Sequence, residues 1–68
     1  MKLNINGQSR EMKTLSIPSV LEMEAVPRED WNSIAVARNG NIIPKSAWGE
    51  VQLAENDNID IVRPFAGG

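Results

Sequence analysis

Two Asn-Gly dipeptides constrain the fold more than any other feature of this sequence. Asn-Gly favours the positive φ angles of a two-residue hairpin turn, so each dipeptide predicts a pair of antiparallel strands. Asn6-Gly7 follows residues 1–5, in which apolar and polar side chains alternate, and precedes a return strand expected at residues 9–12. Such alternation is typical of a half-buried strand, and we therefore expect the chain to open with a β-hairpin.

The second dipeptide, Asn39-Gly40, predicts another hairpin in the middle of the chain. It joins residues 34–38 to residues 41–43, and Pro44 ends the second segment. Both segments are rich in Ile, Val and Ala, as expected for strands that pack against a core.

A short helix is predicted between the two hairpins. Ser16 can cap the first turn through its hydroxyl, and Pro18 is tolerated in that turn because its missing N–H would have no helical partner. Pro27 is expected to end the helix, which we place at residues 18–25. The residues at helical spacing that form its apolar face are Ile17, Val20, Leu21 and Ala25.

Strands on both sides of a single helix indicate the α+β class. Residues 51–53 are expected to pair with the sheet again, and the last strand is predicted at residues 59–63. The helix must then cover one face of a sheet of four to five strands, since no other element can bury the strand residues expected to face it: Leu3, Ile5, Ile34, Val36, Ile59 and Ile61.

Composition narrows the possible functions. The 68 residues form one small domain, and the absence of Cys and His removes the commonest general base and the commonest metal ligands, so neither a catalytic residue nor a metal site is expected. A net charge of −2 without a basic cluster argues against nucleic acid. No stretch approaches the ~20 apolar residues of a membrane span and no signal peptide is visible, so we expect a cytoplasmic protein without a membrane partner.

The sequence after Pro64 reads Phe65-Ala66-Gly67-Gly68. We expect residues 1–64 to form the folded domain and residues 65–68 to form a flexible tail, which at ~3.3 Å per residue could reach ~13 Å beyond the last strand. Glycine has no Cβ, so the end of such a tail can pass through a channel little wider than the backbone. Phe65 can either close the core or fill a pocket on a partner.

The sequence resembles the ubiquitin-like sulfur carriers, the ThiS/MoaD-like family, and most closely the sulfur carriers of thiamine (thiazole) biosynthesis. The resemblance rests on the opening hairpin and on residues 34–40 (IAVARNG), 42–48 (IIPKSAW) and 57–68 (DNIDIVRPFAGG). It departs from the family between residues 14 and 33, where a longer helix is usual. Met23 and Trp31 are expected to supply part of the missing apolar surface.

The resemblance implies a ubiquitin-like β-grasp fold with a mixed sheet, and a carrier that needs neither a bound cofactor nor phosphopantetheine. It implies that Gly68 is adenylylated by an E1-like adenylyltransferase that uses ATP. A persulfide protein would then convert Gly68 to a thiocarboxylate, and thiazole synthase would accept the sulfur while Phe65, Ala66 and Gly67 enter its active site. The chain itself would be a substrate of these enzymes.

Two other functions share the same ending. One is the small subunit of molybdopterin synthase, a sulfur carrier for molybdenum cofactor. The other is a ubiquitin-like interaction or conjugation module, whose tail would form an amide with lysines.

The outward sides of residues 34–38 and of the last strand present either a shallow apolar patch that docks a partner or scattered surface apolar residues. Ala35 and Ala37 should point outward if their neighbours face the helix, and Val62 should lie on the same side. Arg63 at the end of the strand could pair with an acidic partner or be a solvated side chain. Trp31 and Trp48 are expected to fill edges of the core.

Overall fold

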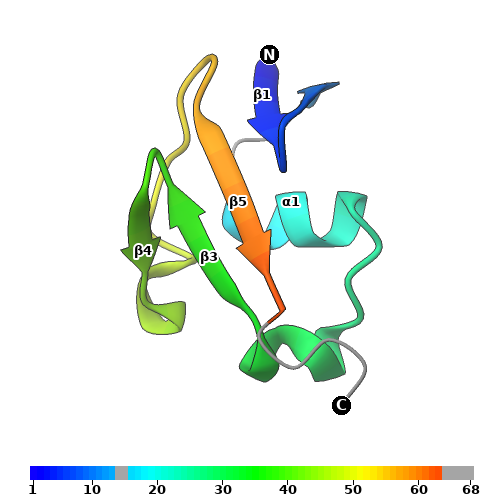
Figure 1. Ribbon diagram of the computed structural model, residues 1–68, viewed down its shortest axis with the longest axis vertical. Helices are drawn as coiled ribbons and strands as arrows, with labels where there is room; N and C mark the ends of the chain where they lie inside the picture. The colour runs from blue at the N-terminus through cyan, green and yellow to red at the C-terminus, as the bar shows by residue number, and fades with distance from the viewer. Residues whose placement is uncertain (14–15, 64–68) are drawn as a thin grey trace.

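A five-stranded sheet with one α-helix across a face forms the protein (Figure 1). The structure, a computed structural model, describes residues 1–13 and 16–63. The strands lie in the order β2-β1-β5-β3-β4. Their bounds are Lys2–Ile5 (β1), Gln8–Glu11 (β2), Ala35–Arg38 (β3), Asn41–Ile43 (β4) and Asn58–Val62 (β5).

Both predicted hairpins are present, and the strand between them in space is β5. Asn6 and Asn39 have φ of 50° and 51°, and the glycines after them have φ of 83° and 87°, as a two-residue turn with positive φ requires. β5 pairs parallel with β1 and antiparallel with β3. The mixed sheet packed on one helix confirms the predicted α+β, β-grasp architecture.

Helix α1 spans Ile17–Met23 and ends earlier than the predicted range of residues 18–25. Ser16 caps it as expected, since its Oγ accepts a hydrogen bond of 3.2 Å from the Ser19 N–H. The prediction for Ala25 is wrong: Ala25 is exposed and has φ of 59°, outside the helix. The Val26 N–H donates to the Leu21 carbonyl (2.9 Å), so the helix closes in a Schellman turn before Pro27.

The core lies between α1 and the sheet. Its residues include strand, helix and loop positions: Leu3, Ile5, Met12, Ile17, Val20, Leu21, Val26, Val36, Trp48, Leu53 and Ile59. Trp31 packs against this cluster, as predicted, whereas Met23 is 55% exposed and supplies little core surface. The two tryptophans meet edge to face with ring centroids 6.1 Å apart.

Two short 3₁₀ helices and a loop complete the described part of the chain. They are η1 (Arg28–Ser33), which leads into β3, and η2 (Lys45–Ala47), which follows β4. Residues 51–53 form no strand, contrary to the prediction, although Leu53 is buried. The return strand of the first hairpin begins one residue earlier than predicted and ends at Glu11.

Candidate functional site

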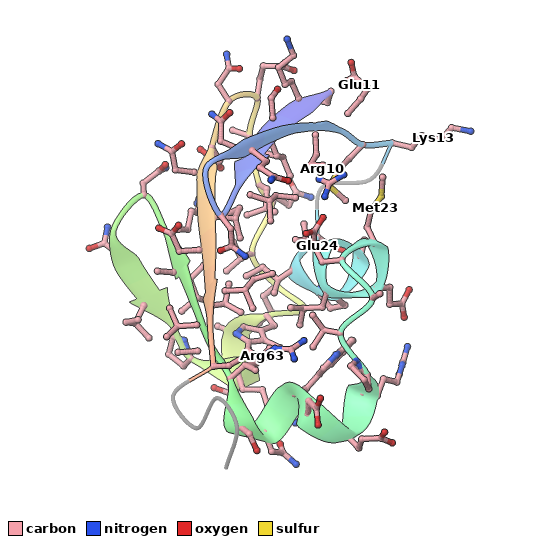
Figure 2. All side chains as sticks on the ribbon, turned by 45° about the vertical axis from the view of Figure 1, so that its right-hand side comes forward. Arg10, Glu11, Lys13, Met23, Glu24 and Arg63 are labelled. Atoms are coloured by element: carbon pink, nitrogen blue, oxygen red, sulfur yellow. The ribbon has the colours of Figure 1, made fainter. Side chains whose placement is uncertain are left out.

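β5 occupies the centre of the sheet and carries the predicted tail at its carboxyl end. Arg63 follows the strand and is exposed, and the end of β5 lies near η1 in both views (Figures 1 and 2). The four residues of the predicted tail, Phe65, Ala66, Gly67 and Gly68, lie outside the described residues, as does Pro64.

The asparagines of both hairpin turns hold β5 in place. Asn6 Oδ1 accepts a hydrogen bond from the Ile61 N–H (2.8 Å), and Asn39 Oδ1 accepts one from the Asn58 N–H (2.9 Å). The two turns were predicted from Asn-Gly, but these long-range bonds were not, because a local turn signal carries no information about a strand so far along the chain. As a result, β5 is fixed from both sides.

Asp57 anchors the start of the same strand. Its carboxylate accepts hydrogen bonds from the Ala54 N–H (2.7 Å), Asn39 Nδ2 (3.0 Å) and Arg38 Nε (2.8 Å). Burial of the carboxylate favours the neutral form, but the hydrogen bonds from Ala54, Asn39 and Arg38 and the Arg38 charge outweigh it, so the pKa of Asp57 is lowered. We assign this group a structural role at the end of the sheet opposite the tail.

No described element covers the face of the sheet opposite α1, here called the open face, and it contains three of the four predicted docking residues. Ala35 pairs with Val62, and Ala37 lies between Asp60 and Ile42 in the register of the three strands. Val62 is 49% exposed and Ala35 is half-buried.

Two details of this face differ from the prediction. Ala37 points outward but is only 9% exposed, so it forms the floor of the face and offers little contact surface. Ile42, which the prediction missed, is 66% exposed beside Ala37. Counting residues outward from the Asn39-Gly40 turn pairs Ile42 with Ala37. The outward position of Ile42 could therefore have been predicted from the turn alone.

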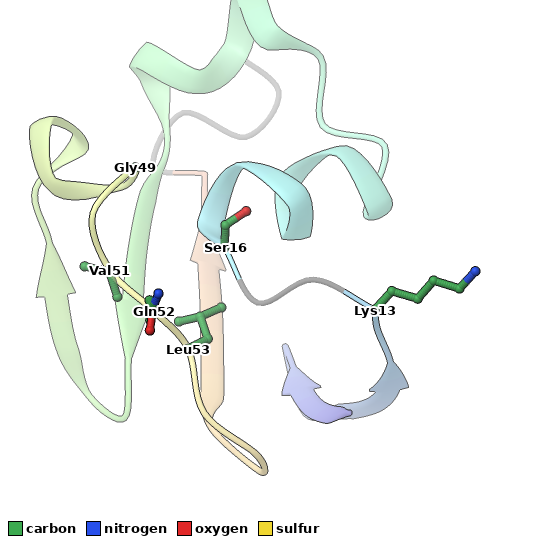
Figure 3. Close-up of a pocket in the computed structure, with 6 residues that line it drawn as sticks. All are labelled: Lys13, Ser16, Gly49, Val51, Gln52 and Leu53. Carbon is green, nitrogen blue, oxygen red and sulfur yellow. The ribbon is translucent and has the colours of Figure 1, made fainter.

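A pocket on another side of the molecule offers no catalytic arrangement among its described residues (Figure 3). Its Ser16 hydroxyl is engaged in capping α1 and donates to Ser19 Oγ (2.8 Å). The Lys13 side chain extends away from the other lining side chains. The pocket is lined by Lys13, Ser16, Gly49, Val51, Gln52 and Leu53.

Two kinds of feature are absent from residues 1–13 and 16–63. No group of three or more acidic side chains is placed to hold a metal ion. No helix in this part of the chain has the length and apolar character needed to cross a membrane.

Comparison with known proteins gives one family match. Residues 3–68 match the model of the ThiS family. The crystal structure of a thiamine biosynthesis protein (ThiS) from Geobacter metallireducens aligns over 100% of both chains with a TM-score of 0.80 and 20% sequence identity. At this identity the likeness establishes the fold alone. No curated protein matches the sequence.

Proposed function

Because the chain belongs to the ThiS family, we propose that it is a sulfur carrier of thiamine (thiazole) biosynthesis and that the reactive group is the carboxylate of Gly68. The observation that supports this most directly is that the family match spans residues 3–68 and so includes the terminal Gly67-Gly68. The protein is then a substrate of partner enzymes, and we assign it no catalytic residue.

A carboxylate is a poor electrophile, which explains why the proposed carrier needs activation. Attack of the Gly68 carboxylate on the α-phosphate of ATP, in an E1-like adenylyltransferase, forms an acyl-adenylate and releases pyrophosphate. The terminal sulfur of a partner persulfide attacks the acyl carbon and AMP leaves. The product is an acyl disulfide that keeps the S–S bond of the persulfide. A thiol cleaves this S–S bond, which leaves a thiocarboxylate on Gly68 and a disulfide between the thiol and the partner, and the thiocarboxylate sulfur passes to thiazole synthase.

The open sheet face is the proposed docking surface for these partners. Val62, Ala35 and the exposed Ile42 form an apolar strip over the floor made by Ala37, and Arg63 lies where the strand leads into the tail. A few well-packed residues near the centre of an interface contribute most of its binding energy. A partner that covers this strip would also receive the tail from the end of β5.

Intact-mass measurement tests the proposal. Incubation with the activating enzyme of the same organism, ATP and a persulfide donor should raise the mass by the difference between sulfur and oxygen, and removal of Gly68 should abolish the change. If the enzyme preparation is shown to be active on a known carrier but leaves the mass of this protein unchanged, the proposed chemistry is refuted.

Copurification with a large molybdopterin synthase subunit, in place of a thiazole synthase, would favour the molybdenum pathway. A lysine-linked ladder would favour conjugation.

A further inference from the structure

A methionine-lined groove lies between β2 and α1, on the helix side of the sheet. Figure 2 shows Met23 pointing from the helix toward the end of the hairpin that carries Lys13. Met1 and Met23 are 50% and 55% exposed. The groove, about 710 Å³, falls in the ~300–1,000 Å³ range of ligand clefts. It is lined by Met1, Glu11, Met12, Lys13, Ser19 and Met23.

β2, the strand beside the groove, pairs on one edge only among residues 1–13 and 16–63. Even-numbered residues of β1 bond toward β5, as the Asn4 N–H does with the Asp57 carbonyl (2.9 Å), and Met1 and Met12 exchange hydrogen bonds across the hairpin. By the alternation of an antiparallel ladder, the backbone N–H and C=O groups of Ser9 and Glu11 point away from β1. Since β2 is the edge strand and all four of its residues are exposed, these groups are available for a further strand.

The charge at this edge is the opposite of that of the whole chain. Residues 1–13 hold three of the seven basic residues and one of the nine acidic residues. Arg10 pairs with Glu24 (3.3 Å), and Glu11 pairs with the Met1 amino group (2.7 Å). Lys13 is exposed and has no ion-pair partner among residues 1–13 and 16–63.

We propose that β2 and the methionine-lined groove bind an extended segment of a partner protein, which pairs with β2 as an added strand. Its backbone would bond to Ser9 and Glu11, and its alternate aliphatic side chains would enter the groove over Met12 and Met23. Acidic residues at its end would lie beside Lys13. Two copies of this basic edge would instead bring like charges together, which is why an acidic segment is the better occupant. The unbranched thioethers of methionine adapt to different aliphatic side chains.

A synthetic peptide tests the proposal on the full chain, independently of Gly68 chemistry. The probe is a capped peptide that alternates Ile with Thr and ends in two Asp residues, titrated into ¹⁵N-labelled protein. Saturable shifts are expected for the amides of β2, Lys13 and α1, and not for β3 or β4. The same peptide with alternate amides N-methylated cannot pair as a strand and should not bind. Equal binding of the two peptides, or shifts confined to the open sheet face, would overturn the proposal.

Variants at exposed positions locate the site. Met23→Glu and Lys13→Glu should each weaken peptide binding about tenfold, because each places a negative charge beside an acidic segment. Asn41→Glu adds the same charge to the other edge strand, β4, and should leave the affinity unchanged. Equal effects of all three variants would show nonspecific electrostatic attraction and contradict the proposal.

A titration of the protein without peptide tests for self-association. Amide shifts of β2 that depend on protein concentration would identify a second copy as the occupant and overturn the proposal as well.

Discussion

Asp57 is the only charged side chain that is buried among the described residues. Its pKa is lower in the folded than in the unfolded chain, where an Asp titrates at ~3.9, so the folded state binds the proton less readily. The stability that Asp57 contributes is therefore complete above the unfolded pKa and is lost as the pH falls through the lower folded pKa.

Replacing this carboxylate tests its contribution. We expect Asp57→Asn to lower the free energy of unfolding by about 1–3 kcal/mol at pH 7, because the hydrogen bonds to Arg38 and Ala54 lose their charged acceptor. Urea unfolding followed by tryptophan fluorescence measures the change. The gap between wild type and variant should narrow below about pH 4. Asp60→Asn, at an exposed position of β5, is the control, and an equal loss there would contradict the assignment.

Ala25 occupies a backbone conformation that favours glycine. Its φ of 59° is strained for a residue with a Cβ, and its position after α1 is the usual place of a C-terminal glycine. We expect Ala25→Gly to raise the free energy of unfolding by about 0.5–1 kcal/mol, measured as a higher Tm. Ala54→Gly, at an exposed alanine without positive φ, should give no gain. Stabilisation by both substitutions would rule out the backbone explanation.

At the scale of elements, the predictions were correct where residues next to each other in the chain determine the structure, as in turns and helix caps. Asn-Gly gave both hairpins, and Ser16 with Pro18 gave the start of α1. The end of α1 was wrong because alanine favours helix, and no local signal shows that Ala25 turns left-handed. Residues 51–53 look like a strand, but the structure places them outside the sheet. The site was predicted less completely. Ile42 was missed although the Asn39-Gly40 turn pairs it with Ala37, and the bonds from the turn asparagines to β5 depend on contacts with a strand far along the chain.

The β4 strand allows a matched test of the proposed docking face. Ile42 pairs with Ala37 on the open face, while the adjacent Asn41 pairs with Arg38 and points to the other side. We expect Ile42→Glu to slow the partner-catalysed mass increase about tenfold or more by placing a charge in an apolar interface. Asn41→Glu adds the same charge and should leave the rate unchanged. Equal rates for the two variants would place the docking face elsewhere.

At the scale of the whole molecule, we expect the scaffold and the proposed reactive end to be separable. The core of the described residues is formed by positions up to Ile59, with Ile61 packed against it. We expect Gly67→Val to change the free energy of unfolding by less than about 0.5 kcal/mol, because surface substitutions have small effects. The same variant should abolish the mass increase, since a β-branched side chain restricts φ and widens the tail. Undiminished sulfur incorporation would show that the tail does not need to be narrow.

The two turn asparagines also determine how a purified sample ages. Asn-Gly is the dipeptide most prone to lose ammonia through a cyclic imide, which leaves aspartate or isoaspartate. At Asn39 this reaction replaces the amide that donates to Asp57 (3.0 Å) with a second carboxylate, so two negative charges would meet at the start of β5. At Asn6 the carboxylate could still accept the hydrogen bond from Ile61. When aspartate is the product, we therefore expect deamidation to destabilise the protein at Asn39 and to be tolerated at Asn6. Isoaspartate routes the backbone through the side chain, so we expect it to disturb either turn.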